Sequence, residues 1–384
     1  MGRATTRFCF VSLVLTAVLI LWTTNMKATF TSGSILAISL LSSFSLYEKG
    51  LAYSTLLRQD RNNGIHLAVS PVCGPLSGNV SDVNTGINLS TIKTIVAFGD
   101  SYTDGGREDG GPLAPPVVIP PEALAGGRST DGKVWVENIA DDIGATLMDY
   151  AQSGACTDLR LWPSAIKQAD FVGQVKTFLN QSNELDPETT LYAVFFGIND
   201  YGDSMTDGTA NLQAAAQVII DQIAILASPP TNARAFLVTD VYGRGTHTPA
   251  GDAFVQSVFS GLHALRANSS TSASTSTSTS TSTGGEDGGK GEGKGRIQVA
   301  FAEFARIWDG VLGADPGFAA FGYVSTDACI VDCSLTRCTT DGMCDDPEHY
   351  FYYIDGHPSK EGHRIMADYV EEVMRRCVEV PDAA

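Results

Sequence analysis

Four short runs of almost uniformly apolar residues constrain the fold of this chain more than any other feature. They lie at residues 94–98, 191–196, 235–239 and 297–302. Strands that are apolar on both faces are typical of parallel sheets covered by helices on each side. Segments of helical period alternate with these runs, at residues 134–143, 164–180, 210–226, 253–267 and 360–377. The alternation predicts an α/β fold with three layers, α/β/α, around a central parallel sheet.

The N-terminal region differs from the rest of the chain. Arg3 and Arg7 precede an apolar run at 8–22, and Met26 precedes a second apolar stretch at 34–47. Each arrangement is typical of a signal segment or a short membrane anchor. We therefore expect residues 1–52 to be a signal or anchor region, with Met26 as an alternative translation start. The rest of the chain is expected outside the cell, either secreted or held at the membrane by its N-terminus.

The remaining sequence divides into a leader and one domain. Residues 53–90 are polar and weakly periodic, which predicts a leader, and residues 91–384 carry the alternating pattern. Residues 269–295 consist mainly of Ser, Thr, Gly and charged residues, a composition with no apolar side chains to bury. We expect a disordered surface insertion there. The helical segment before it and the apolar run after it continue one pattern, so the insertion does not separate two domains.

Charge and cysteine usage fit an exported protein without nucleic-acid partners. The net charge of −18 offers no basic surface for nucleic acid. Four of the cysteines crowd into residues 329–344 at spacings unlike the paired CxxC of a zinc site, which favours disulfides of open connectivity. If Cys9 is excluded, seven cysteines remain, so one is left over. The N-x-S/T sequences at four asparagines are compatible with glycosylation: Asn79, Asn88, Asn180 and Asn268.

Small polar motifs follow the predicted strands, where ligands bind in open parallel sheets. Ser101 lies in "VAFGDSYTDGG", directly after the first apolar run. "GINDY" follows the second run and contains Asn199, and "YAQSGA" contains Gly154. His357 lies just before the last helical segment, with Pro358 suited to a first helical turn.

These blocks resemble the four blocks of the GDSL, or SGNH, hydrolases, in the same order and over a region from about residue 91 to the C-terminus. The segment "GGRSTDGKVWVENIA", at 126–140, is similar to one found in plant and fungal members. "FFGINDY" and "GHPSKEGHRIMADYV" are most similar to fungal acetylesterases of carbohydrate esterase family 16. The resemblance implies a flavodoxin-like sheet and an esterase that uses no metal or organic cofactor. It also implies acetyl esters of cell-wall oligosaccharides as substrates, and we expect a monomer.

The resemblance also implies a role for each block. Ester hydrolysis needs a nucleophile, a base and donors for the developing oxyanion. Ser101 would be the nucleophile and His357 the base that takes its proton. The oxyanion hole would consist of the backbone N–H groups of Ser101 and Gly154 and the side-chain amide of Asn199. Tyr102, Thr103 and Tyr201 flank these blocks, and we expect them to line the substrate cleft.

The third member of the triad departs from the family pattern. The aspartate that usually stands three residues before the histidine is replaced by Ile354, while Asp355 stands two residues before it. Asp355 is then a candidate to orient His357. In the alternative interpretation Asp355 is a turn residue, and a backbone carbonyl or a water molecule holds the ring.

Two other functions stay open from the sequence. A GDSL lipase would act on longer acyl esters, although no long apolar segment outside the N-terminal region suggests an acyl-chain channel. A non-catalytic surface protein would keep the fold to bind carbohydrate, and the missing aspartate at position 354 leaves room for it. The intact serine, glycine, asparagine and histidine favour the small-ester hydrolase.

Overall fold

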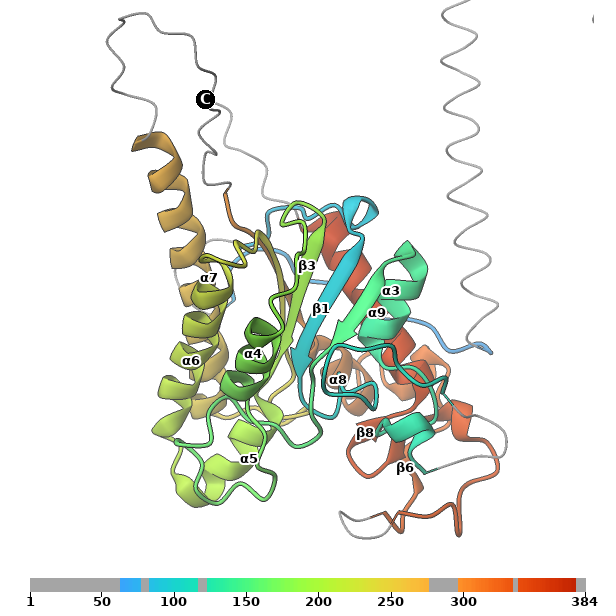
Figure 1. Cartoon of the computed structure of the whole chain (residues 1–384). Helices are drawn as coiled ribbons and strands as arrows, with labels where there is room; N and C mark the ends of the chain where they lie inside the picture. The colour runs from blue at the N-terminus through green and yellow to red at the C-terminus, as the bar shows by residue number, and fades with distance from the viewer. Residues whose placement is uncertain (1–62, 77–82, 117–122, 276–295, 334–337, 378–384) are drawn as a thin grey trace, which may run out of the picture. The chain divides into compact units, whose positions relative to one another are not determined.

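The computed structural model describes residues 63–76, 83–116, 123–275, 296–333 and 338–377 (Figure 1). All described residues belong to one unit, Asn62–Ala384. The expected signal or anchor region lies outside the described residues. Across those described ranges, no helix has the length and apolar character needed to cross a membrane.

A five-stranded parallel sheet forms the centre of the domain, as predicted. Its strands, in spatial order, are β2 (Thr146–Asp149), β1 (Thr94–Gly99), β3 (Thr190–Phe195), β4 (Ala235–Asp240) and β5 (Gln298–Glu303). The order 2-1-3-4-5 is that of flavodoxin-like folds, whose ligands bind beside β1 and β3 at the carboxyl ends of the strands. The four apolar runs became β1, β3, β4 and β5. The edge strand β2 escaped prediction because it is only four residues long and mostly half-buried or exposed.

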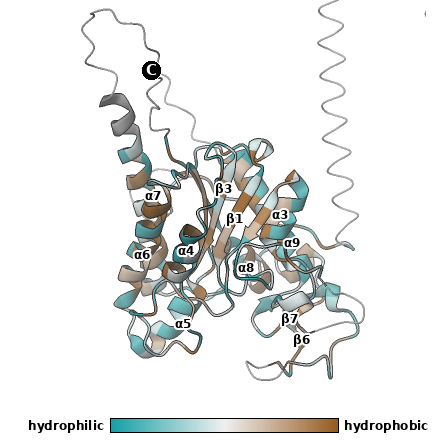
Figure 2. Ribbon diagram, viewed as in Figure 1, coloured by the Kyte–Doolittle hydropathy of each residue, from teal (hydrophilic) through white to brown (hydrophobic). Residues whose placement is uncertain are grey.

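Helices cover both faces of this sheet, which confirms the three-layer architecture (Figure 1). One face packs against α3 (Trp135–Ile143), α8 (Ala305–Leu312) and α9 (Lys360–Arg376). The other packs against α4 (Phe171–Asn180), α6 (Asn211–Leu226) and α7 (Pro249–Thr275). Along β1 the side chains alternate between the two layers: Ile95 and Ala97 face the first, Val96 and Phe98 the second. In Figure 2 the hydrophobic colour accordingly marks β1 and β3, whereas α5 (Ile198–Asp207) is hydrophilic.

Two helices differ from their predicted ranges by more than one residue. Helix α4 begins at Phe171, later than residue 164, because the Asp170 side chain accepts a hydrogen bond from the Gly173 N–H and caps the helix there. Helix α7 continues to Thr275, so the first residues of the expected disordered insertion have helical backbone. Residues 276–295 lie outside the described part of the chain.

The structure also contains a smaller sheet, which was not predicted, and three disulfides, whose pairing was left open. The sheet consists of β6 (Ser325–Ile330), β7 (Tyr350–Ile354) and β8 (His357–Pro358). The disulfides link Cys329 to Cys344, Cys333 to Cys338 and Cys73 to Cys377, which confirms the disulfide prediction and supplies its connectivity. Among the described cysteines, Cys156 is the one left over, and it is buried. The short 3₁₀ helices span Leu89–Thr91, Ala125–Gly127, Phe318–Phe321 and Pro347–His349.

The described parts of the leader pack onto the domain. Ile65, Val83 and Ile87 are buried in its core. The Thr85 N–H donates to the Val299 carbonyl at 2.9 Å, and the Asn84 side chain accepts from the Phe301 N–H at 2.9 Å. The leader thus satisfies backbone groups of the edge strand β5, which would otherwise be free to pair with another chain.

Candidate active site

Ser101 lies directly beyond the carboxyl end of β1. The Gln174 side chain ends the strand by bonding both backbone groups of Gly99: it accepts from the N–H at 3.0 Å and donates to the carbonyl at 2.8 Å. The backbone then turns, because the Asp100 carbonyl accepts from the N–H groups of Thr103 and Asp104. A Cβ on Gly99 would lie 2.7 Å from the Thr103 hydroxyl oxygen, so this turn requires glycine.

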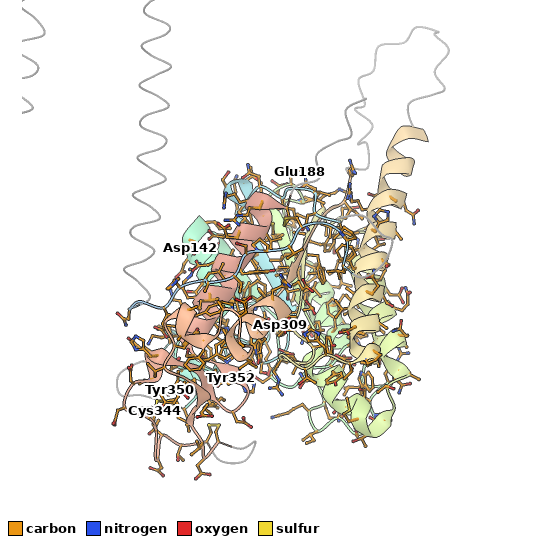
Figure 3. The ribbon with its side chains drawn as sticks, turned by 180° about the vertical axis from the view of Figure 1, so that it is seen from behind. Asp142, Glu188, Asp309, Cys344, Tyr350 and Tyr352 are labelled. Atoms are coloured by element: carbon orange, nitrogen blue, oxygen red, sulfur yellow. A yellow bond between two sulfur atoms is a disulfide. The ribbon has the colours of Figure 1, made fainter. Side chains whose placement is uncertain are left out.

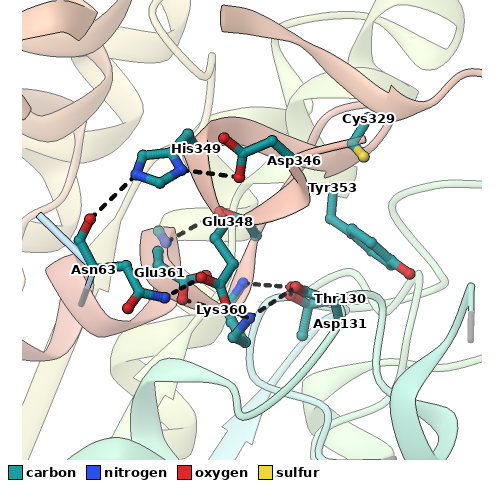
Figure 4. Close-up of polar contacts among 12 residues, drawn as sticks. Asn63, Thr130, Asp131, Cys329, Asp346, Glu348, His349, Tyr353, Lys360 and Glu361 are labelled. Carbon is teal, nitrogen blue, oxygen red and sulfur yellow. Dashed lines mark hydrogen bonds and ion pairs between the residues drawn. The ribbon is translucent and has the colours of Figure 1, made fainter. Parts of the chain in front are cut away.

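The segment at 126–140 holds the histidine loop in place. The Thr130 hydroxyl donates to the Pro358 carbonyl at 2.9 Å, and the Lys360 N–H donates to the Asp131 carboxylate at 2.7 Å. Figure 4 shows the Lys360 ammonium between Asp131 and Glu348, at 3.5 Å and 2.8 Å. Residues 126–140 therefore hold both the connection between β7 and α9, which contains His357, and the first turn of α9.

These two elements bring Ser101 and His357 together. The Ser101 Oγ lies 2.8 Å from the His357 Nε2, across 256 residues of sequence. The His357 Nδ1 lies 2.9 Å from the backbone carbonyl oxygen of Asp355. A carbonyl oxygen can only accept, so Nδ1 carries the proton of the neutral ring and Nε2 presents a lone pair to the serine hydroxyl. The ring therefore has the tautomer that a general base requires.

The contact with Nδ1 differs from the triad interpretation of Asp355. Its backbone oxygen, not its carboxylate, is the group at hydrogen-bond distance from the ring, and the side chain is exposed. Gly356, with φ +65°, turns the chain so that this carbonyl lies beside His357. The geometry matches the alternative in which Asp355 is a turn residue and a backbone carbonyl holds the ring.

The imidazole is held in its neutral form. Desolvation is the largest cause that lowers the pKa of His357 to about 4, and the positive charge of Arg244 lowers it further, whereas the hydrogen bond that the ring donates to the Asp355 carbonyl raises it. At neutral pH the ring is thus free to accept a proton.

Among the described residues, the three groups expected to form an oxyanion hole have hydrogens that are free or weakly engaged. Within the described chain, the N–H groups of Ser101 and Gly154 have no hydrogen-bond acceptor. Gly154 has φ +84° inside a turn closed by the Ala155 N–H and the Gln152 carbonyl, a position that favours glycine. The Asn199 amide donates to the Ala155 carbonyl at 2.8 Å and lies 3.3 Å from the Asp100 carboxyl, so its second hydrogen is weakly engaged.

Buried carboxyl groups tie these loops to one another. The Asp104 carboxylate accepts from the N–H and hydroxyl of Ser153, beside Gly154. The Asp200 carboxylate accepts from Thr157 and from the Trp162 indole, which fixes the start of α5 against the Gly154 loop. Burial raises the pKa of Asp100 to about 8, so this carboxyl group is largely uncharged at neutral pH and competes little with an oxyanion for the Asn199 amide.

The residues expected to line the cleft lie elsewhere or stay predictions. Tyr102 and Thr103 are fully buried: the Tyr102 ring stacks on Phe195, and the Thr103 hydroxyl accepts from the Trp135 indole. Both pack into the core behind Ser101 and do not line an open cleft, which corrects that expectation. Tyr201 is half-buried on α5, and its place in a substrate cleft stays a prediction.

Sequence reasoning missed Arg244, which lies in the loop after β4. Its Nη1 donates to the Gly356 carbonyl at 3.0 Å, and the Tyr102 hydroxyl donates to the same oxygen. "VYGRGTHT" offered no family block or charge pattern to mark this arginine. Its position just beyond the carboxyl end of a parallel strand was the available signal.

Comparison with known proteins identifies the family. A family model described as GDSL-like Lipase/Acylhydrolase matches residues 95–370, well over half of the chain. The chain belongs to this family. The predicted membership of the GDSL/SGNH hydrolases, which are carboxylic ester hydrolases, is therefore confirmed.

A curated relative and several solved structures share this similarity. An acetylesterase of Hypocrea jecorina is 34% identical over 143 residues, which cover 30% of this chain and 39% of that protein. An acetylxylan esterase from Geobacillus stearothermophilus is 13% identical with a TM-score of 0.35, covering 77% of this chain and 98% of that chain. A G-D-S-L family lipolytic protein from Veillonella parvula is 15% identical with a TM-score of 0.36, covering 74% and 99%.

Proposed function

We propose that this protein is an exported serine esterase that hydrolyses small acyl esters through an acyl-enzyme. The observation that carries the proposal is the 2.8 Å contact between the Ser101 Oγ and the His357 Nε2. Beside it, the N–H groups of Ser101 and Gly154 lack acceptors in the described chain. A hydroxyl, a base of the right tautomer and free donors at one strand end suit acyl transfer.

In the first step the ester carbonyl lies above Ser101 with its oxygen among the three donors. The serine proton passes to the His357 Nε2 as Oγ bonds to the carbonyl carbon. The oxyanion accepts hydrogen bonds from the N–H groups of Ser101 and Gly154 and from the Asn199 amide. Donors aimed at the charge that develops are worth about 3 kcal/mol each in comparable sites.

The intermediate then collapses. The alcohol oxygen leaves with the proton from Nε2, and the acyl group stays on Oγ. A water molecule gives its proton to Nε2 and attacks the acyl carbon, after which the carboxylic acid departs and Ser101 recovers its proton. During both steps the imidazolium Nδ1–H keeps its bond to the Asp355 carbonyl.

Similarity to a curated acetylesterase supports acetyl esters as substrates. The similarity of the motifs "FFGINDY" and "GHPSKEGHRIMADYV" to fungal acetylesterases supports acetylated cell-wall oligosaccharides as the molecules that carry these esters. Three disulfides are compatible with the oxidising space outside the cell, as are the exposed sequons at Asn88, Asn180 and Asn268. The N-terminal segments expected to direct export support the same location.

One set of assays tests this function. The full chain and Ser101→Ala are offered p-nitrophenyl acetate, p-nitrophenyl palmitate and acetylated xylo-oligosaccharides. Acetate release that the variant loses supports the proposal. Preference for palmitate would instead select a GDSL lipase, and binding of the oligosaccharides without turnover would select the carbohydrate-binding protein.

A further inference from the structure

The acceptor of His357 Nδ1 is a neutral peptide carbonyl in a turn, and such a group is only as well placed as the turn itself. In a serine-protease triad a buried carboxylate orients the ring and stabilises its charged form. Here the next peptide carbonyl, that of Gly356, accepts hydrogen bonds from two residues distant in sequence. These donors are the hydroxyl of Tyr102, the residue after Ser101, and the Nη1 of Arg244 in the loop after β4, which lies 3.0 Å from the oxygen.

The backbone on both sides of this contact is shaped for it. Arg244 is a non-glycine residue with φ +49°, in a turn where its N–H donates to the Val241 carbonyl. Positive φ is unfavourable for a residue with a Cβ and persists where the surroundings enforce it, often at functional sites. On the other side, a Cβ added to Gly356 would lie 2.2 Å from the Arg244 Nη1. Glycine is therefore needed at position 356 for the guanidinium to approach.

No carboxylate of the described residues forms an ion pair with the guanidinium, and the carboxyl group that interacts with it electrostatically, Asp100, has a pKa raised by burial to about 8. None of the ion pairs formed within the described ranges involves Arg244, which is half-buried beside the Tyr102 hydroxyl. An arginine held near a catalytic imidazole disfavours the protonated ring, because like charges repel.

The other groups around His357 do not cancel that charge. Tyr102 and Tyr352 are neutral phenols whose pKa values are raised by burial (Tyr352 is labelled in Figure 3). His363 packs behind Tyr102, and burial lowers its pKa to about 3, so it is neutral. Ser101 is uncharged, and Asp355, the one anion that acts on the ring, has an exposed and therefore screened carboxylate.

We propose that Arg244 is a positioning residue for His357: it fixes the Asp355–His357 turn through the Gly356 carbonyl and, together with the burial of the ring, favours the neutral, proton-accepting imidazole. In the first part, the hydrogen bond from Arg244 to the Gly356 carbonyl, here called the backbone clamp, orients the ring in place of a triad carboxylate. The second part allows the base to work at acidic pH. This inference rests on the proposed function in that it takes His357 as the base.

Three substitutions separate the two parts. Arg244→Met removes both charge and donors, Arg244→Gln removes the charge and retains an N–H donor, and Arg244→Lys retains the charge with a single donor group. Loss of the clamp should lower kcat of Arg244→Met by about 10- to 100-fold, because small misplacements of a catalytic group cost that much. Arg244→Gln should lose less.

The charge has its own signature. In Arg244→Met and Arg244→Gln the His357 pKa should rise by about half a unit to one unit, whereas Arg244→Lys should leave it near the wild-type value. The matched control is Arg375→Met, at an exposed arginine in the last turn of α9 that pairs with Glu372. It should change neither kcat nor the pKa.

The experiment combines two readouts on the full chain. NMR titration of ¹³C-labelled histidine gives the His357 pKa, with the signal assigned by its absence in His357→Asn. The pH dependence of kcat/KM for p-nitrophenyl acetate gives the same pKa in the working enzyme. Thermal unfolding of each variant identifies any that fail to fold, and Arg244→Lys and Arg244→Gln keep the test available if Arg244→Met does.

The outcomes are distinct. A raised His357 pKa in the two uncharged variants, with a larger kcat loss in Arg244→Met than in Arg244→Gln, supports the inference. An unchanged pKa with unchanged kcat would overturn it, as would a rise in KM alone, which would make Arg244 a substrate contact. If the wild-type chain hydrolyses no ester, the proposed function fails, yet the NMR titration still decides whether Arg244 controls the ring.

Discussion

Replacement of Asp355 by asparagine should have little effect on the rate of this esterase, although the residue lies two positions before His357, the proposed general base. The Nδ1 contact of 2.9 Å is made by the backbone carbonyl, which the substitution retains. What is lost is the attraction between an exposed carboxylate and the transient imidazolium. Exposed ion pairs contribute at most about 1 kcal/mol, which corresponds to about a fivefold loss in kcat.

Gly356→Ala provides the contrast at the adjacent position. Alanine at φ +65° is disfavoured, and its Cβ would lie 2.2 Å from the Arg244 Nη1, so either the guanidinium must leave the Gly356 carbonyl or the turn must shift. We expect about a 100-fold loss of kcat with the fold retained. Gly356→Ala should therefore lose more activity than Asp355→Asn. If the Asp355 side chain completed a triad, Asp355→Asn would show the larger loss.

The assay is the initial rate on p-nitrophenyl acetate at pH 7, with Ser101→Ala as the inactive reference and thermal unfolding as the check on folding. A loss of about 10⁴-fold in Asp355→Asn, the size seen when a triad aspartate becomes asparagine, would refute the carbonyl assignment. Full activity of Gly356→Ala would refute the importance of the turn.

Three further outcomes follow from the geometry. Asn199→Ala should lower kcat by about 100-fold with little change in KM, because the amide acts on the oxyanion that forms in the transition state; an equal loss in binding of a non-reactive substrate analogue would contradict this. The kcat/KM of the wild type should decline only as the pH falls toward about 4, since His357 must be neutral to accept the serine proton and its pKa is lowered to about 4; a decline centred near pH 6.5 would contradict the burial of the ring. Asp240→Asn should stabilise the protein more at pH 8 than at pH 5, because burial, and then the Glu303 charge, raises the pKa of Asp240 well above its usual value. When a group has a higher pKa in the folded than in the unfolded state, the free energy of unfolding of the protein falls as the pH rises above the unfolded pKa. Urea unfolding of variant and wild type at both pH values measures the difference.

The sheet and its helices were largely predictable because burial on both faces leaves a clear signal in β1, β3, β4 and β5. The edge strand β2 and the helix α5 carry no such signal. Four residues at the sheet edge and a hydrophilic ten-residue helix owe their structure to neighbours, such as the bonds from Thr157 and Trp162 to Asp200. The small sheet contains disulfide-bonded cysteines, and the spacing of the cysteines along the sequence did not show which of them pair.

The site divides in the same way. Ser101 and His357 were accessible from the sequence because their side chains perform the contact, and side-chain identity is what a motif records. The Asp355 carbonyl was not, because every residue at that position has one. Arg244 was missed for a related reason: it donates to a peptide carbonyl, so neither the residue type of its partner nor the spacing marks the pair.

The isoleucine at position 354 finds its explanation in the small sheet. Ile354 ends β7, pairs with Ile330 of β6 and is 5% exposed in an apolar cluster with Tyr353 and Cys329. An aspartate there would bury a carboxylate in this largely apolar cluster, at a cost of several kcal/mol wherever hydrogen bonds do not compensate for its burial. A chain that packs this position into a disulfide-linked sheet must orient its histidine by other means. The Asp355 carbonyl, held through Gly356 by Tyr102 and Arg244, meets that need with a neutral acceptor, and a neutral acceptor is also the kind that leaves the pKa of the imidazole low.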